Sequence, residues 1–595
     1  MSTIPLGTYL FNRIHQLGIS RIMGCPGDFN MTLLDHIFNV EGLDWIGCCN
    51  ELNAAYACDG YGRTRGLPGV LVTTYGVGEL SAMNGVSGAF AEHVPMLHIV
   101  GTPARPEMEY NMWMHHTLPG GSEAEAPDHR VYSRMSAPLR CCSAALENLD
   151  TVADEIDRVL YTIFRKSLPG YLFVPLDMVN APVPVAGLEK PLKLEIVNPD
   201  PQLEDALVLE ILDGLYKAKK PAILADILAR RHRARELVME LVGQTMIPSF
   251  STDLAKGFVD EDHPAFVGQY NGRLSRPGVA EAMEDSDFVL NIGPLITDNN
   301  TGGFTRFIDD KLTVMLHPAY VSVFGVRHDN LHFLPILEKL VAKLDVSKLS
   351  NTRKPTDIVV GESKKTESPA DISTSYFYPY IGDHFLKAND VVFADSGTAQ
   401  YAINDAKFPK NVNFTTQLYY SSIGFALPAA LGASIAQREI DEGNLGPKGR
   451  VVLFEGDGSS MMTIQELSTI ARYGYNPTIF LINNEGYTIE RAIHGPEAKY
   501  NDITPHWKWT ELFSTFGASP DKYFATKVET RAELETLLSS KEFADAEHKV
   551  RFVEVKMDRL DIPWRLSEQV AEIAKKTAKW FTEYSTKMGE VPRAT

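Results

Sequence analysis

The sequence has no long apolar run and few cysteines. Within its 595 residues, no stretch reaches the roughly 18 consecutive apolar residues that a membrane-spanning helix needs. Its first segment, MSTIPLGTYLFNRIHQLG, lacks a basic region followed by an apolar one, so we expect no signal peptide. The six cysteines lie in the first quarter of the chain and none is spaced C-x-x-C, which favours reduced thiols over disulfides or zinc. These absences predict a cytoplasmic protein.

Basic residues are fewer than acidic ones, 57 against 76. The formal net charge of −19 argues against nucleic acids and anionic membranes as partners. A hydrophobic fraction of 44% and a charged fraction of 22% are those of an ordinary globular protein with an ample core. The length allows about four domains, or fewer if each is large.

Residues 451–494 have the pattern of a strand–helix–strand unit. Val451–Phe454 and Thr478–Ile482 are short apolar runs typical of buried strands. Thr463 and Glu466 have the spacing of a capping box, which predicts a helix beginning there. Parallel strands joined by a helix end at the same edge of a sheet, and ligands bind at that edge. The residues that follow the two strands are therefore expected to meet.

Those residues have the chemistry of a phosphate and metal site. Asp457, in the GDG turn, offers a carboxylate, and Asn484, after the second strand, offers an amide oxygen. The Gly486 carbonyl adds a third oxygen, and a small set of protein oxygens suits Mg²⁺. Gly458 and Ser459 expose backbone N–H groups near a helix start, which suits phosphate. A GDG turn alone would indicate only a tight turn between a strand and a helix. Its combination with the later Asn pair favours a phosphate and metal site.

The same segment resembles a known family. GDG followed one strand–helix unit later by NN is similar to the thiamine-diphosphate signature, and NNEGYTIERAIHG resembles the 2-oxo acid decarboxylases, in particular the pyruvate decarboxylase branch. The resemblance covers nearly the whole chain. It implies an α/β fold with three doubly wound parallel-sheet domains and a helical tail. The expected ranges are a pyrimidine-binding domain at 1–185, a middle domain at 195–345, a diphosphate and Mg-binding domain at 372–561, and the tail at 562–595.

In the first domain, polar residues follow predicted strands. Asp28 lies in a turn at a strand end, and Asn30 has the position of a cap for the next helix. Glu51 opens another helix, where an acid commonly serves only the helix dipole. The segment CNELNAAYACDGYGR, however, resembles the one that holds the cofactor-activating glutamate. His115 and His116 are similar to the histidine pair of pyruvate decarboxylase-like enzymes, and near Asp28 they could share protons.

The middle and third domains give fewer direct signals. The middle one has no Gly-rich dinucleotide fingerprint, so we expect a structural or regulatory role. In the third, the resemblance places Thr398 beside the diphosphate, Ser421 and Ile423 at the aminopyrimidine, and Ile489 in the cofactor pocket. The tail Leu566–Phe581 is amphipathic and is expected to cover the mouth of the active site. Its apolar face comprises Leu566, Val570, Ile573 and Ala574.

The resemblance implies non-oxidative decarboxylation of pyruvate or a related 2-oxo acid to an aldehyde and CO₂, through a thiamine-diphosphate ylid and enamine. Asp457, Asn484 and Gly486 would hold Mg²⁺ and the diphosphate, and Glu51 would activate the cofactor. The implied catalytic residues for proton transfer are Asp28, His115, His116 and Glu490. The cofactor would lie between two subunits of a homodimer or homotetramer.

Two polar residues depart from the family pattern in the expected substrate pocket. Ile489 and Ile493 form the apolar wall that the family leads us to expect. Gln400 stands where relatives often have a small or aromatic residue, and Asn299 where they usually have an aromatic one. We therefore hypothesise a cavity that accepts a functionalised 2-oxo acid, or that holds a water beside pyruvate.

Two alternatives stay open. An acetolactate-synthase-type carboligase would bind flavin in the middle domain, and the histidine pair argues against it. A non-enzymatic assembly protein would have lost Glu51 or the metal ligands, and the sequence retains both.

Overall fold

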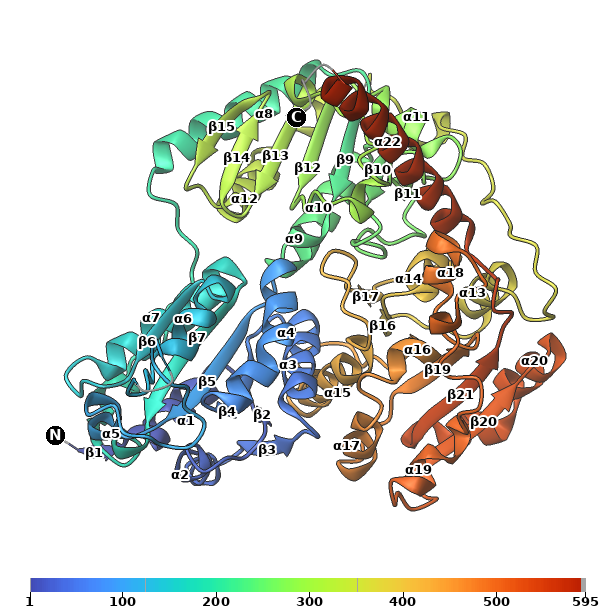
Figure 1. The fold of residues 1–595 in the computed structure, drawn as a ribbon. Coiled ribbons are helices and arrows are strands. Elements are labelled where there is room, and N and C mark those ends of the chain that lie inside the picture. Colours follow the sequence, from blue (N-terminus) through green and yellow to red (C-terminus); the bar gives the residue numbers. More distant parts are fainter. Residues whose placement is uncertain (1, 123–124, 350, 590–595) are drawn as a thin grey trace.

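The computed structural model describes residues 2–122, 125–349 and 351–589, with the backbone alone for residues 577, 578 and 580–589. Three large sheets follow one another along the chain, and we call them the N-terminal, middle and C-terminal sheets (Figure 1). This arrangement confirms the predicted α/β class. The exact domain boundaries stay a prediction. No helix in the described ranges has the length and apolarity needed to cross a membrane.

The N-terminal sheet has the strand order β3-β2-β4-β5-β7-β6, and all its pairs are parallel. Its central strands β4, β5 and β7 are buried along their whole length and mainly apolar, because helices cover both faces. The strands are β2 (Arg21–Gly24), β3 (Asp44–Gly47), β4 (Gly69–Thr74), β5 (Met96–Thr102), β6 (Cys142–Ala145) and β7 (Pro169–Pro175). The main helices are α1 (Leu6–His15), α3 (Glu51–Arg65), α4 (Val77–Ala91) and α7 (Val152–Lys166).

The middle sheet has the order β11-β10-β9-β12-β13-β14-β15. Its strands are β9 (Pro221–Ala225), β10 (Ser249–Ser251), β11 (Phe266–Gln269), β12 (Phe288–Ile292), β13 (Thr313–His317), β14 (Tyr320–Val323) and β15 (Val326–Asp329). Strands β13, β14 and β15 pair antiparallel, so this sheet is mixed, with a parallel part from β11 to β13. The turns between them span two residues each, and a parallel crossover needs a dozen or more. The covering helices include α8 (Pro201–Lys217), α10 (Arg235–Thr245), α11 (Val279–Glu284) and α12 (Phe333–Lys343).

The C-terminal sheet has the order β17-β16-β18-β19-β21-β20 and is parallel throughout. Its strands are β16 (Val391–Ala394), β17 (Asn413–Thr415), β18 (Val451–Gly456), β19 (Thr478–Asn483), β20 (Tyr523–Val528) and β21 (Val550–Lys556). The main helices are α13 (Thr374–His384), α14 (Thr398–Ala402), α15 (Ala426–Glu442), α17 (Glu466–Arg472), α18 (Thr488–His494) and α20 (Arg531–Ser539). The tail forms α22 (Trp564–Gly589), which runs from this sheet along the middle one (Figure 1).

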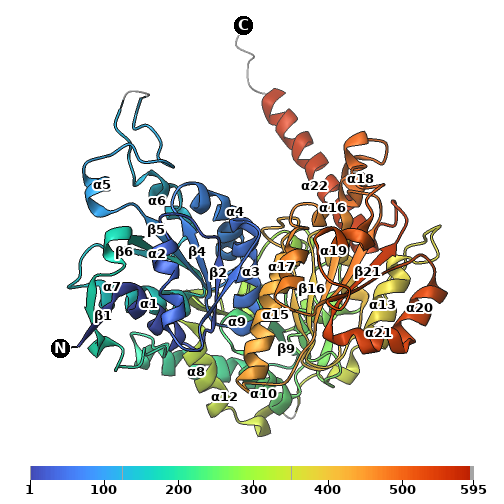
Figure 2. The same cartoon turned by 90° about the horizontal axis from the view of Figure 1, so that it is seen from below.

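Helices α3 and α15 join the N-terminal and C-terminal sheets at the centre of the molecule, as both views show (Figure 2). Glycines allow their backbones to touch. A Cβ on Gly60 would lie 2.0 Å from the Ala429 carbonyl oxygen, and one on Gly432 would lie 1.7 Å from that of Ala57. One apolar core therefore runs through both regions and fixes them relative to each other.

Two predicted helix caps are wrong. Helix α17 begins at Glu466 itself, because the Thr463 hydroxyl donates to the Gly424 carbonyl (2.7 Å) instead of capping. The Glu466 carboxylate accepts from the Asn53 amide (2.7 Å) at the start of α3. Asn30 precedes the short helix α2 (Met31–Leu34), but its side chain braces the preceding turn and makes no cap bond.

Candidate active site

The segments after β18 and β19 meet at the carboxyl edge of the C-terminal sheet, as the strand pattern predicted. The two strands are neighbours and parallel. The Gly486 N–H donates to Asp457 Oδ2 at 2.9 Å, although the residues are 29 positions apart. Asp457 is fully buried, and burial raises the pKa of its carboxyl to about 6.

Three oxygens converge at this point. The Asn484 side-chain oxygen points at two other acceptors, the Gly486 carbonyl oxygen at 2.9 Å and Asp457 Oδ1 at 3.1 Å. Rotating the amide would place its NH₂ there instead and satisfy both. Oxygens in an octahedral Mg²⁺ shell, bound at 2.0–2.1 Å, lie about 3 Å apart. The donor set and its spacing therefore fit this ion.

A cavity of about 750 Å³ opens beside the oxygen cluster. Thr398, Ser421, Ile423, Gly458 and Ser459 all line it, with Gly486 and Ile489. A Cβ on Gly458 would lie 2.5 Å from the Tyr487 ring, so the turn can pack there only as glycine. Small residues at the start of short helices suit a diphosphate, although the Gly458 N–H already donates to Asp457 Oδ1 (3.0 Å).

The expected substrate residues line the same cavity. Asn299, Gln400, Ile489, Glu490 and Ile493 all contribute to its wall. Helix α22 closes another side, and the four apolar residues predicted for the tail's inner face all reach it: Leu566, Val570, Ile573 and Ala574.

Amide groups form a polar patch in this wall. Asn299 donates to the Leu418 carbonyl (2.9 Å) and accepts from the Gln569 amide of α22. Gln400 is 6% exposed, and its side-chain oxygen is buried without a hydrogen-bond partner. The Gln569 oxygen also lacks a partner. Two unpaired amide oxygens in a cavity wall are costly unless a ligand or water donates to them.

A second group of candidate residues lies at the N-terminal sheet. Asp28 forms a hydrogen bond with His115 Nε2, and His116 Nε2 lies 3.9 Å from its other oxygen. The two histidine rings are 4.6 Å apart. All three side chains are partly exposed, so the structure brings these residues together at the surface.

Glu51 begins α3 next to this group. The Asn50 side chain caps the helix by accepting from the Asn53 N–H (2.8 Å). A Cβ on Gly78 would lie 3.1 Å from Glu51 Oε1, so the carboxylate lies at the start of α4. None of the residues Glu51, Asp28, His115 and His116 lines the cavity. One chain therefore carries two half-sites that do not share a cavity.

Three family descriptions match the chain. They are the N-terminal TPP-binding domain of thiamine pyrophosphate enzymes at residues 4–124, the central domain at 208–340 and the C-terminal TPP-binding domain at 395–555. The chain belongs to the thiamine pyrophosphate enzymes. The three matches follow the order of the three sheets.

Relatives are similar along nearly the whole length. The pyruvate decarboxylases of Candida glabrata and Kluyveromyces lactis are each 40% identical, over 97% of this chain and 100% of the relative. A transaminated amino acid decarboxylase of Saccharomyces cerevisiae is 37% identical, over 97% of this chain and 96% of the relative.

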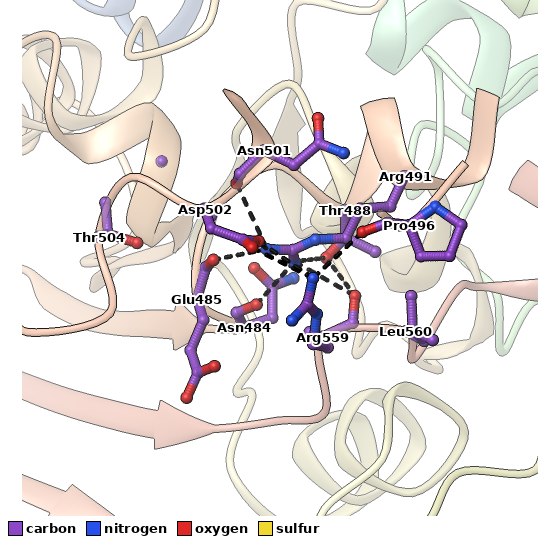
Figure 3. Close-up of polar contacts among 12 residues, drawn as sticks. Asn484, Glu485, Thr488, Arg491, Pro496, Asn501, Asp502, Thr504, Arg559 and Leu560 are labelled. Atoms are coloured by element: carbon purple, nitrogen blue, oxygen red, sulfur yellow. Dashed lines mark hydrogen bonds and ion pairs between the residues drawn. The ribbon is translucent and has the colours of Figure 1, made fainter. Parts of the chain in front are cut away.

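The structure of this thiamine pyrophosphate enzyme also reveals residues that the sequence did not indicate. Arg491 donates to the carbonyls of Asn484 (2.9 Å) and Glu485 (2.6 Å) and pairs with Asp502, so it fixes the loop after β19 (Figure 3). The position of Arg491, one residue after Glu490, did not indicate this role in the sequence. Its partners come near it only through the path that the loop takes in the folded protein.

Asp395 fixes another part of the cavity wall. Its buried carboxylate accepts from the N–H groups of Gly424 (3.0 Å) and Ala426 (2.9 Å), and burial raises its pKa to about 6. It thereby holds the 421–425 segment, with Ser421 and Ile423, at the end of β16. In the sequence, the turn Asp395-Ser396-Gly397 after an apolar run was the feature that could have indicated this role.

Proposed function

We propose that the protein catalyses the non-oxidative decarboxylation of a 2-oxo acid to an aldehyde and CO₂, with thiamine diphosphate and Mg²⁺ as cofactors. The convergence of the Asp457, Asn484 and Gly486 oxygens beside a cavity of about 750 Å³ carries the proposal. The decarboxylase relatives support it over a carboligase. The cysteines, all free, agree with a cytoplasmic location.

The C-terminal half-site would hold the cofactor. Asp457, Asn484 and the Gly486 carbonyl would bind the metal, and Thr398, Gly458 and Ser459 the diphosphate. When bound, thiamine diphosphate supplies a carbon nucleophile and an electron sink for the departing carboxylate's electrons. Ile423 and Ile489 would hold its rings in the cavity and exclude water.

The N-terminal half-site would complete the centre from a second copy of the chain. Glu51 would hydrogen-bond the pyrimidine and hold a proton there. Large apolar side chains are exposed around both half-sites, among them Trp113 (61%) beside the histidines and Ile493 (64%) in the cavity wall. Such patches mark interfaces. We therefore propose a homodimer, or a homotetramer of such dimers, with the site between subunits.

Proton transfer would fall to four residues from the two copies. Asp28 and His115 are hydrogen-bonded, and His116 lies beside them, so this cluster can pass one proton among its members. Glu490 faces the cavity from the other copy. Together they would protonate the substrate-derived carbon and release the aldehyde.

The polar patch bears on the choice of substrate. The unpaired oxygens of Gln400 and Gln569 favour a 2-oxo acid with a hydrogen-bond donor at its far end, or pyruvate together with a water. Steady-state rates on a panel would test this. Rates on long aliphatic and aryl substrates that equal those on hydroxyl- or amide-bearing ones would contradict it.

Aldehyde release from pyruvate and other 2-oxo acids tests the function itself. The assay compares the wild type with Glu51→Gln, with and without thiamine diphosphate and Mg²⁺. We expect release that requires both cofactors and falls at least about a hundredfold in the variant. Acetolactate without free aldehyde would favour the carboligase, and no product from any substrate would refute catalysis of either kind.

A further inference from the structure

A second cavity lies at the carboxyl edge of the middle sheet. Its volume is about 730 Å³, within the range of small-molecule sites. The segments that follow β11 and β12 form it, at residues 272–284 and 304–307, and Glu572 and Lys576 of α22 also line it. Figure 1 shows α22 beside α11. Because β9 to β13 are parallel, this edge is where α/β sheets bind ligands.

Cationic side chains outnumber acidic ones around this cavity. It is lined by the cations Arg273, Arg276, Arg306, Lys364 and Lys576 and by the acids Glu281, Glu284 and Glu572. The acids already have donors. Glu281 accepts from the Gly278 N–H (2.9 Å), Glu284 from the Tyr270 hydroxyl (2.8 Å), and Glu572 from Arg273 (3.1 Å).

Three of the cations donate to backbone carbonyls, and two of them also lie over aromatic rings, Arg306 at 5.2 Å from the Tyr270 centroid and Lys576 at 6.0 Å from that of Phe304. Arg276 donates to the Gly361 carbonyl (2.8 Å), Arg306 to that of Tyr270 (3.1 Å), and Lys576 to those of Gly303 and Phe304. Within the described ranges, none of the three has a carboxylate at ion-pair distance. Arg306 Nε is buried without a hydrogen-bond partner, and burial lowers the pKa of this guanidinium. The buried carboxylates of Asp226 and Asp253 raise that pKa again, but less than burial lowers it, so the protein compensates the charge of Arg306 only in part.

We propose that this cavity binds a phosphate group, either inorganic phosphate or a small phosphate monoester. Two guanidinium groups and an ammonium supply the forked and point-charge donors that phosphate oxygens take. The neutral remainder of the lining, with Phe304, Phe307 and Pro277, leaves room for an organic portion. The sequence of the middle domain has no Gly-rich dinucleotide fingerprint, so a dinucleotide is not the expected ligand.

Helix α22 connects this cavity to the active-site cavity. Gln569, Val570 and Ile573 line the active-site cavity, while Glu572 and Lys576 of the same helix line the phosphate cavity. A phosphate that bridges Lys576 to Arg306 would hold α22 against the middle sheet and over the substrate. By linkage, substrate and phosphate then favour each other's binding. We expect phosphate to lower the KM for the 2-oxo acid, a step that rests on the proposed function.

Calorimetric titration of phosphate into the holoenzyme tests the site. Inorganic phosphate and glycerol 3-phosphate are titrated separately into the wild type, Lys576→Gln, Arg306→Gln and Arg306→Lys. Arg327→Gln is the matched control, because Arg327 lies on β15 of the same sheet and is paired with Asp329. We expect saturable binding that weakens at least about tenfold in the two glutamine variants of the site. The control should bind as the wild type does, and Arg306→Lys should bind with intermediate affinity.

The two ligands distinguish the source of the phosphate group. Tighter binding of glycerol 3-phosphate identifies a monoester site, and equal binding identifies a site for free phosphate. Absence of saturable binding to the wild type, or equal binding by the wild type and Lys576→Gln, would overturn the proposal. Lys576 is exposed, so this variant does not threaten folding. Calorimetry requires no turnover, so the result stands even if the decarboxylase assignment fails.

Discussion

At the scale of single residues, the Tyr487 ring leaves no room for a side chain at Gly458. A Cβ there would lie 2.5 Å from Tyr487 Cε1 and would displace the ring or the turn that carries the proposed diphosphate donors. We expect Gly458→Ala to weaken thiamine diphosphate binding at least about tenfold, which is about 1.4 kcal/mol. Quenching of protein fluorescence on titration with the cofactor measures this.

Gly243 provides the control for that prediction. It lies within α10, and a Cβ there would meet nothing within 4 Å. Alanine should therefore stabilise the helix by about 0.5–1 kcal/mol and leave cofactor affinity unchanged. Equal cofactor affinity in Gly458→Ala and Gly243→Ala would show that the close approach to Tyr487 has no role in binding.

His98 is a buried residue whose protonation opposes folding. It is fully buried on β5, it forms a hydrogen bond with the Thr73 hydroxyl (2.9 Å), and its ring lies 4.5 Å from Tyr171. Burial, with Arg140 nearby, lowers its pKa to about 3. The unfolded chain has a histidine pKa of about 6.5. As the pH falls from 6.5 toward 3, only the unfolded state takes up the proton, so stability is lost.

We expect this one residue to lower the free energy of unfolding by about 2 kcal/mol between about pH 7 and about pH 5. Urea unfolding at both pH values would show a smaller loss in His98→Gln than in the wild type. His384→Gln, which changes an exposed histidine of α13, should retain the wild-type loss. Glu79, whose pKa burial raises to about 7, acts with the opposite sign, but it is present in all three proteins. Identical losses in all three would contradict the prediction.

At the scale of elements, the sequence predicted strands better than caps. The predicted strands Val451–Phe454 and Thr478–Ile482 begin where β18 and β19 begin and end within two residues of their ends, because buried strands are continuously apolar and are bounded by turn residues. The capping box failed because Thr463 and Glu466 have partners at Gly424 and Asn53, far away in the chain. The antiparallel strands β14 and β15 were missed because their two-residue turns lie outside any strand–helix alternation.

Helix α22 is expected to contribute to the KM for the 2-oxo acid through the residues that line the cavity. Val570 lines the active-site cavity, whereas the next residue, Ala571, is exposed. We expect Val570→Asn to raise the KM for the 2-oxo acid about tenfold, because it replaces apolar wall by an amide that the substrate does not satisfy. Thiamine diphosphate affinity should not change, because the diphosphate donors lie on other elements.

Ala571→Asn introduces the same side chain one position away and should have no effect on either parameter. Steady-state kinetics at saturating cofactor measure both variants. A KM increase in both would show that asparagine disturbs the helix as a whole, and an increase in neither would remove α22 from the substrate wall.

At the scale of the whole molecule, the sequence predicted which residues gather but not what holds them. Asp457 and Asn484 follow neighbouring parallel strands, so their meeting could be derived from spacing. Asp395 and Arg491 act through backbone groups of loops whose paths no local pattern indicates. The hydrogen bond between Asp28 and His115 spans 87 positions and was expected only through family resemblance.

The two half-sites lead to a prediction about the assembly. Glu51 lies outside the cavity that the Asp457 region lines in one chain, which led us to propose that a second copy completes the centre. Glu51→Gln and Asp457→Asn should each abolish activity when alone. In a mixed dimer, however, one of the two centres receives both wild-type residues and the other receives both substitutions.

Co-expression of differently tagged variants followed by tandem purification would isolate the mixed dimer, and its aldehyde release per centre can then be measured. If each centre takes Glu51 from one copy and Asp457 from the other, the mixed dimer has about half the activity of the wild type, and random mixing without purification gives about a quarter. A centre built within one chain would leave every chain with one defect, so the mixed dimer would be as inactive as its parents.

The double variant Glu51→Gln/Asp457→Asn paired with a wild-type chain reverses the expectation: shared centres would all carry one defect and be inactive, whereas a self-contained wild-type chain would retain its activity. The two pairings contain the same substitutions in the same number, so differences in folding cannot produce opposite outcomes.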